Sequence, residues 1–389
     1  MLFRQVVIKT KLLKGIIGVI YQQLLNRMTK SMLGTGATES IIAEDGKVTL
    51  KKYRKHRRRL KKLKREFRQS ITHLENLHGS CINHLRPVTE PLALISQIQR
   101  SGGSLLSQLC DGHPQLHAHP HELKIGYPDK YTWPQIDLDD HPKHWFETFF
   151  ESNVINHFKN GYKKQKNMDE TFLFLFLPSV QRDLFLNYID SVSSKSLRDV
   201  FNAYMTSYFG AWLNNQNTSG DKKFITAFTA RLAMDKDNVE SFFKIYPDGR
   251  LISIIRDPKN WYPSAVRHKP LDYEDIRKAL DLWVKSARSM LWNKERFGDR
   301  VCVIRFEDLI GKTESVMRYL AAFLKIEFDD ILLIPTFNCS IIQANTSFDT
   351  HESGIIKSTL ARHKTLTNNE IEIIDEMTND IYYAVSRAF

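Results

Sequence analysis

A short loop in the first third of the chain carries the residue types that bind a phosphate. Residues 99–103 (QRSGG) separate an apolar run at 92–97 (LALISQ) from a helical stretch at 104–110 (SLLSQLC). Two glycines let the backbone turn sharply, and the free N–H groups and positive dipole end of a helix attract an anion. Arginine and serine side chains add a charged fork and hydroxyl donors. The residues expected to bind the anion are Arg100, Ser101, Gly102, Gly103, Ser104 and Leu105.

A second cationic motif follows a later apolar run. Residues 251–255 (LISII) lead into Arg256-Asp257-Pro258, and Ser264 lies eight positions after the arginine. In an open parallel sheet, ligands bind beyond the carboxyl ends of the strands, which is where Arg256 would lie. A guanidinium and a hydroxyl brought together there can clamp a phosphate. This pair predicts a second phosphate contact.

The two motifs together resemble those of the sulfotransferase family. Residues 100–114 (RSGGSLLSQLCDGHP) are similar to the loop that binds the 5′-phosphosulfate of 3′-phosphoadenosine 5′-phosphosulfate (PAPS), and Arg256 with Ser264 is similar to the family's 3′-phosphate motif. Residues 307–309 (EDL) resemble a further family signature. The resemblance covers residues 91–383 and implies a sulfotransferase that uses PAPS and releases adenosine 3′,5′-bisphosphate. The acceptor it implies is a hydroxyl of an unidentified carbohydrate or other alcohol.

The resemblance also implies two further nucleotide contacts, from Phe306 and from Lys357, with Arg362 as the alternative to Lys357. The chain departs from the family's pattern at two places. Gly103 stands where the family usually has a hydroxyl residue, and residues 228–231 (FTAR) stand where many relatives have a K-T-P-like element. A cation directed at the sulfate from that element would therefore have to come from Lys223 or Arg231.

The mechanism expected by analogy with phosphoryl transfer is an in-line displacement in which positioning and charge stabilisation dominate. Arg100 would stabilise the leaving group. The base should come from residues 117–122 (HAHPHE), since a carboxylate or imidazole within reach of the acceptor hydroxyl suffices. Glu122 is the first choice, because several relatives resemble this arrangement, and His121 is the second.

The remaining histidines near the loop have no assigned chemistry. His113, His117 and His119 are expected to be solvated loop residues. No metal site is expected, because histidines on an irregular segment that contains a proline set no clear coordination geometry.

The fold class expected is α/β, with a central parallel sheet flanked by helices in a P-loop-like sulfotransferase fold and a basic α-helical extension at the N-terminus. From residue 91 onward, short apolar runs alternate with helical periodicity, as in βα units. We expect an amphipathic helix and linker at residues 1–47, a basic amphipathic helix at 48–85 and the catalytic domain at 86–389.

The positive charge is concentrated in one segment. The chain of 389 residues has a net charge of +12, and residues 51–68 contain 12 Lys and Arg against one Glu, which leaves 12 − 11 = +1 for the rest. Such a segment suits RNA, an anionic membrane surface or an acidic partner, and equally a solvated helix that packs on the body or on a second copy of the chain. A homo-oligomer through the N-terminal helix therefore stays open.

Two other functions compete with the enzyme. An RNA- or anionic-membrane-binding protein that acts through the basic helix, with a degenerate α/β domain, is the alternative function. A kinase would need G-x-x-x-x-G-K-S/T, and the G-K-T at 311–313 has Phe306 in the place of the first glycine. The apolar run at 15–25 is too short to span a membrane and the four cysteines are far apart, so we expect a cytoplasmic protein, with peripheral membrane contact by residues 9–30 left open.

Overall fold

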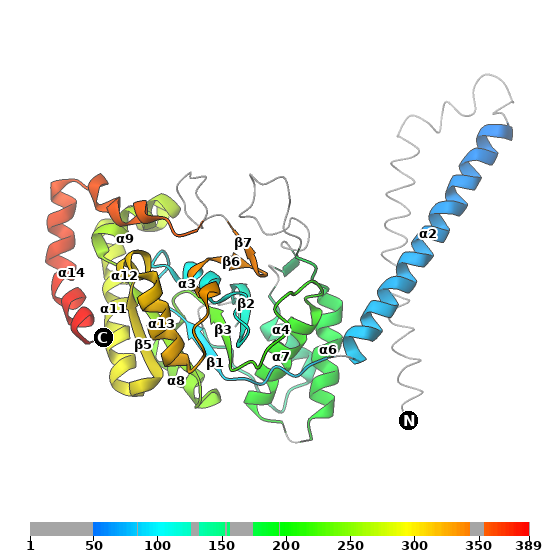
Figure 1. The fold of residues 1–389 in the computed structure, drawn as a ribbon, viewed down its shortest axis with the longest axis horizontal. Helices are drawn as coiled ribbons and strands as arrows, with labels where there is room; N and C mark the ends of the chain where they lie inside the picture. The colour runs from blue at the N-terminus through cyan, green and yellow to red at the C-terminus, as the bar shows by residue number, and fades with distance from the viewer. Residues whose placement is uncertain are drawn as a thin grey trace. The chain divides into compact units, whose positions relative to one another are not determined.

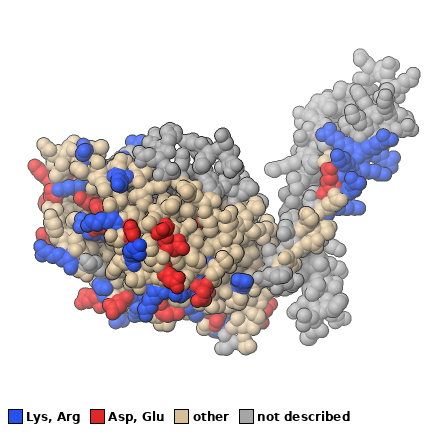
Figure 2. All heavy atoms as spheres, viewed as in Figure 1, with Lys and Arg blue, Asp and Glu red and all other residues tan. Residues whose placement is uncertain are grey.

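The computed structural model describes residues 50–83, 85–125, 132–151, 154–155, 174–193, 195–342 and 354–388. The chain divides into two units, Met1–Gly79 and Ser80–Phe389. The basic helix predicted from the sequence is present as α2 (Leu50–Asn83), and its described Lys and Arg side chains form a dense positive surface (Figure 2). The helix predicted within residues 1–47 lies outside the described residues. Within the ranges above, no helix combines the length and the apolar character needed to cross a membrane.

Five parallel strands form the centre of the second unit, in the order β2-β3-β1-β4-β5 (Figure 1). Their bounds are β1 (Leu92–Ile95), β2 (Leu116–Glu122), β3 (Phe224–Phe228), β4 (Arg250–Ile255) and β5 (Val301–Arg305). Helices flank this sheet, so the α/β fold predicted from the alternating apolar runs is confirmed.

Alternate residues of β1 enter different hydrophobic clusters. Leu92 and Leu94 share one cluster with α4 (Pro142–Phe149), α6 (Pro178–Ser191), α7 (Leu197–Ala211) and α8 (Lys236–Ile245), whereas Ala93 and Ile95 share a second with α3 (Gly103–Cys110), α12 (Phe306–Gly311) and α13 (Thr313–Leu324). Successive side chains of a strand point to opposite faces of the sheet. A strand covered on both faces must therefore be apolar throughout, which is why LALI contains no polar residue.

A third hydrophobic cluster lies beside the β4–β5 half of the sheet and includes Ile255 and Val303. Its helices are α9 (Pro258–His268), α10 (Pro270–Tyr273), α11 (Ile276–Phe297) and α14 (Asn368–Ala388). The remaining elements are the 3-10 helices η2 (Leu232–Met234), η3 (Gly298–Arg300), η4 (Asp330–Leu333) and η5 (Lys357–Thr365), and the antiparallel pair β6 (Thr336–Phe337) and β7 (Ser340–Ile341).

The register of the strands brings the predicted motifs to one edge of the sheet. Ile95 at the end of β1 pairs with Ile252 of β4, and Glu122 at the end of β2 pairs with Phe228 of β3. The chain leaves β1 toward β2 on one side, while β4 and β5 lie on the other side. The carboxyl ends of β1 and β4 therefore flank a topological switch point, the position where α/β sheets bind ligands.

Replacing Leu94 with Ala should lower the free energy of unfolding by about 2–5 kcal/mol, because the side chain is fully buried and its removal leaves a cavity. Chemical denaturation followed by circular dichroism measures the change. Leu271→Ala is the control, since Leu271 is 88% exposed, and it should change stability by less than about 0.5 kcal/mol. Equal losses in the two variants would contradict a central position for β1.

Candidate functional site

A cavity of about 290 Å³ lies at the carboxyl edge of the sheet. The loop after β1, the start of α3, the end of β2, the second half of α9, and η5 all contribute to its wall. Most of the side chains predicted from the sequence meet there, namely Arg100, Gly102, Gly103, Ser104, Leu105, Glu122, Arg256, Ser264 and Phe306. The two cationic motifs, separated by more than 150 residues in the sequence, therefore share one cavity.

The glycine loop is held in a conformation that ordinary residues adopt with difficulty. Gly102 has a φ of 102° and precedes α3, and Arg100 also has a positive φ, of 69°. A non-glycine residue in this region costs about 1–3 kcal/mol, so it persists only where the surroundings fix it. The indole Nε1 of Trp261 donates to the carbonyl oxygen of Gln99 at 2.8 Å, which anchors the loop to α9. The first residues of α3, Gly103 to Leu105, line the cavity, and the start of a helix attracts an anion.

Phe306 and Phe228 explain why the loop needs both glycines. A Cβ at Gly102 would lie 2.6 Å from Cδ2 of Phe306, and a Cβ at Gly103 would lie 2.2 Å from Cε2 of Phe228. The hydroxyl residue that sulfotransferases usually have at the second position has no room here. The departures at Gly103 and at 228–231 are therefore linked, because the Phe228 ring fills the space that a side chain at position 103 would need.

Arg256 joins the two motifs. Its Nη1 donates to the carbonyl oxygen of Arg100 at 2.8 Å, and its Nη2 donates to that of Thr359 at 3.1 Å. The guanidinium carbon lies 4.3 Å from the centroid of the Phe306 ring, a cation–π contact. Arg256 is 4% exposed, and burial lowers the pKa of its guanidinium to about 10, with the nearby positive charges acting in the same direction.

Three guanidinium groups line the cavity, against a single carboxylate among its described lining residues, Glu122. Nε of Arg100 donates to Oγ of Ser264 at 3.3 Å, so the 3′-phosphate motif touches the glycine loop. Burial lowers the pKa of Arg100, and so does the charge of Arg362. Positive charges crowded together in this way attract an anion of more than one charge.

Two polar atoms at this site have no partner among the described residues. They are the buried Oγ of Ser101 and the Nε of Arg256. Buried donors are nearly always hydrogen-bonded, so an orphaned pair beside a cavity indicates groups that a ligand satisfies. Ser101 does not itself line the cavity wall, whereas Ser264 does.

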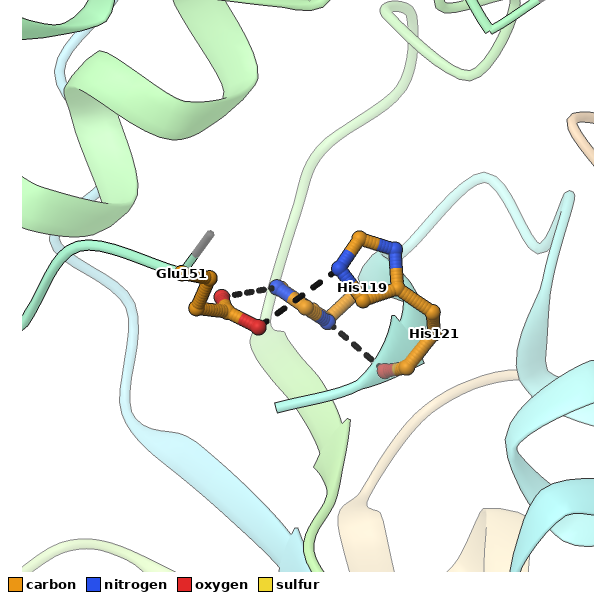
Figure 3. Close-up of side chains that lie close together, drawn as sticks. All are labelled: His119, His121 and Glu151. Carbon is orange, nitrogen blue, oxygen red and sulfur yellow. Dashed lines mark hydrogen bonds and ion pairs between the residues drawn. The ribbon is translucent and has the colours of Figure 1, made fainter. Parts of the chain in front are cut away.

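Glu122 and its neighbour His121 lie in different surroundings. Glu122 lines the cavity, whereas His121 turns its ring toward the buried carboxylate of Glu151 (Figure 3). Burial lowers the pKa of His121. Of the two bases predicted from the sequence, Glu122 is the one placed at the cavity.

The histidines that we expected to be solvated are not. His113 is fully buried and its Nε2 donates to the Glu327 carbonyl oxygen at 2.9 Å, His119 is 1% exposed, and His117 is half-buried. His117 and His119 lie on the strand β2, not on an irregular loop. Histidine and proline have weak strand preference, so the pattern LHAHPHE did not indicate a strand.

Lys223 and Arg231, suggested from the sequence as cations directed at the sulfate, lie outside the cavity. Arg231 donates to Gln99 and, at 2.7 Å, to the hydroxyl of Tyr273, and Lys223 lies at the start of β3 near Lys325. Neither lines the cavity. Lys357 is exposed and is also not part of the wall, whereas Arg362 is.

A protein-family model and several solved structures match this chain. A family model described as "Sulfotransferase family" matches residues 91–330. Similar solved structures include the sulfotransferase domain from the curacin biosynthetic pathway (17% identity, TM-score 0.40, covering 75% of this chain and 98% of that chain). Others are the sulfotransferase domain of the Synechococcus PCC 7002 olefin synthase (18%, 0.37, 72% and 95%) and mouse sulfotransferase SULT7A1 complexed with PAP (13%, 0.33, 81% and 94%). No curated protein matches the sequence.

Replacing Gly103 with Ser should destabilise the protein by about 1–3 kcal/mol, because the new Cβ would overlap the Phe228 ring. The double variant Gly103→Ser with Phe228→Ala should lose less stability than the sum of the losses in the two single variants. Thermal unfolding of the four proteins measures this coupling. Gly311→Ser is the matched control, since a Cβ there meets nothing within 4 Å. Strict additivity at Gly103 and Phe228 would contradict the steric account.

Proposed function

Because the chain belongs to the sulfotransferase family, we propose that it transfers a sulfuryl group from PAPS to a hydroxyl of an acceptor molecule. The observation that carries the proposal is the shared cavity, where Arg256 of the second motif bonds to the backbone of Arg100 in the first. A nucleotide phosphorylated on its ribose and on its 5′ side needs both motifs at once. If the two motifs lay at strand ends far from each other, each would bind only one of these two phosphate groups.

The residues of the cavity fit PAPS. The orphaned Arg256 Nε is a donor available to phosphate oxygens, and Arg100, Arg256 and Arg362 supply positive charge. The narrow space over Gly102 and Gly103 suits a ligand that contacts backbone N–H groups rather than side chains. PAPS, when bound, supplies the activated sulfuryl group.

Each residue of the wall has a role that follows from its chemistry. Arg100 and the N–H groups at the start of α3 stabilise negative charge that develops on the nucleotide side. Glu122 accepts the proton of the acceptor hydroxyl at its carboxylate. The rings of Phe228 and Phe306 exclude water from the floor of the cavity, which strengthens these electrostatic interactions.

The alternative function rests on residues 51–68 of α2, whose charge suits RNA or an anionic membrane. The preserved cavity favours the enzyme, because a degenerate domain has no reason to keep a 4% exposed Arg256 with an unsatisfied donor. Such a group destabilises the folded protein unless a ligand compensates it. The basic helix is then an additional surface for an anionic partner rather than the principal site.

Arg256→Ala should weaken the binding of adenosine 3′,5′-bisphosphate by at least about tenfold, because a charged hydrogen bond contributes roughly 1.5–3 kcal/mol. Isothermal titration calorimetry measures the dissociation constant. Arg250→Ala is the matched control, since Arg250 starts the same strand, donates to the carbonyl oxygens of Asp248 and Gly249, and does not line the cavity. Thermal unfolding without nucleotide checks that both variants are folded.

Tight binding of ATP with magnesium in place of the bisphosphate would contradict the assignment and support a kinase. Equal affinity of the Arg256 and Arg250 variants for the bisphosphate would remove Arg256 from the site. Stabilisation by RNA alone would favour the alternative function.

Glu122→Gln should reduce sulfuryl transfer by about 10²- to 10⁴-fold, because the amide cannot accept the proton of the acceptor hydroxyl. Its affinity for adenosine 3′,5′-bisphosphate should stay unchanged, since the two side chains have nearly the same shape. Incorporation of label from radiolabelled PAPS into a cell extract measures transfer without knowledge of the acceptor. Glu147→Gln, an exposed change on α4, is the control. A Glu122→Gln variant as active as this control would show that another group is the base.

A further inference from the structure

A buried cluster next to the cavity contains two imidazoles and one carboxylate. His119 and His121 come from β2, and Glu151 follows α4 (Figure 3). The exposed fractions of the three side chains are 0%, 7% and 0%. One ligand atom from each residue lies within 4.8 Å of the other two. Such a convergence of polar groups in the interior needs a reason, because burial of unpaired polar groups is costly.

The hydrogen bonds of His119 determine which of its ring nitrogens carries a proton. Nδ1 lies 2.8 Å from the carbonyl oxygen of His121, and a carbonyl only accepts, so Nδ1 is a donor. In a neutral ring, Nε2 then presents its lone pair, and it faces Oε1 of Glu151 at 3.2 Å. A lone pair and a carboxylate oxygen repel each other. A proton, carried by the ring or by the carboxyl group, or a metal ion must therefore lie between them.

The distances between the ring nitrogens and the carboxylate oxygens favour a metal ion over a proton. Charge-assisted N–H···O bonds are about 2.7–2.9 Å long. Nε2 of His119 and Nε2 of His121 lie 3.2 and 3.5 Å from Oε1 and Oε2 of Glu151, respectively. Neighbouring ligand atoms of a tetrahedral zinc ion, with Zn–N and Zn–O near 2.0–2.2 Å, are about 3.3–3.5 Å apart. The two gaps are long for ionic hydrogen bonds, and the three side chains converge closely enough for one ion to lie between them.

Other hydrogen bonds in the same cluster have ordinary lengths, so the long gaps are specific. The hydroxyl of Tyr204 donates to Oε1 of Glu151 at 2.6 Å, and the backbone N–H of Lys124 donates to Oε2 at 3.0 Å. Metal-bound histidines usually donate their second N–H to a carbonyl or carboxylate, and metal-bound carboxylates accept hydrogen bonds from a second layer. His119 and Glu151 both show this arrangement.

We propose that His119 Nε2, His121 Nε2 and Glu151 bind a divalent transition-metal ion, with zinc as the expected metal and the fourth position filled by water. Two imidazoles and a carboxylate favour zinc over magnesium or calcium, which prefer all-oxygen sites. The site is structural, since its ligands do not line the nucleotide cavity. It ties the end of β2 to the segment after α4, contrary to the expectation from the sequence that the protein holds no metal.

Metal analysis of the full-length protein, purified without a histidine tag and without chelators, tests the proposal. Mass spectrometry of Mn, Fe, Co, Ni, Cu and Zn should find zinc at close to one ion per chain. A chelator should lower the melting temperature, and added Zn²⁺ should restore it. Co²⁺ in place of zinc should give the visible absorption of a tetrahedral site. This arm uses the wild-type protein and so needs no variant to fold.

Glu151→Gln and His119→Gln should each lower the zinc content by at least tenfold. His113→Gln is the matched control and should retain zinc. His113 is equally buried, and among the described residues its ring bonds to the Glu327 carbonyl oxygen and the Gln115 N–H. Wild-type protein that contains no metal and whose melting temperature does not respond to Zn²⁺ or Co²⁺ would overturn the proposal. The cluster would then be a His119 imidazolium paired with Glu151. Zinc retained in both cluster variants would overturn it as well.

Discussion

The buried guanidinium of Arg256 is the group on which the rest of the cavity depends. Through the carbonyl oxygens of Arg100 and Thr359 it joins the end of β4 to the glycine loop and to η5. A charge removed from water needs partners, and removing one side of such an arrangement typically costs 3–5 kcal/mol. Two carbonyl dipoles, the face of Phe306 and the nearby carboxylate of Glu307 supply part of that compensation. On the proposed function, a phosphate group of the nucleotide supplies the rest.

The aromatic rings around the loop change what the loop can offer an anion. Phe228 and Phe306 occupy the space above Gly103 and Gly102, and at Gly103 the resemblance led us to expect a hydroxyl side chain. Recognition at this point must therefore rely on backbone N–H groups and on arginines that reach in from neighbouring elements. Backbone donors are fixed by the fold and lose little entropy on binding, so the exchange keeps the site preorganised.

The sequence predicted those parts of the site that depend on local order. The strand-loop-helix unit around Arg100 and the strand that ends at Arg256 follow from apolar runs, glycines and short spacings, and parallel pairing then places both at one edge. β2 was missed because three histidines and a proline conceal a strand that is buried on both faces. Glu151 was missed because it lies thirty residues beyond His121, and nothing in its neighbours shows that packing brings it back. Arg362 was weighed only as an alternative to Lys357, since the spacing in that segment is loose.

Consecutive residues of β2 connect the buried cluster to the cavity. Side chains that follow one another along a strand face opposite sides, so His121 enters the cluster while Glu122 enters the cavity. The backbone beyond Glu122 is fixed twice, by the bond from Leu123 N to the Phe228 carbonyl oxygen at 2.7 Å and by that from Lys124 N to Glu151 at 3.0 Å. A carboxylate that acts as a base must be held within about 0.5 Å of its working position. A polar cluster in the core, costly as an isolated feature, therefore fixes the backbone that carries Glu122, the base of the proposed reaction.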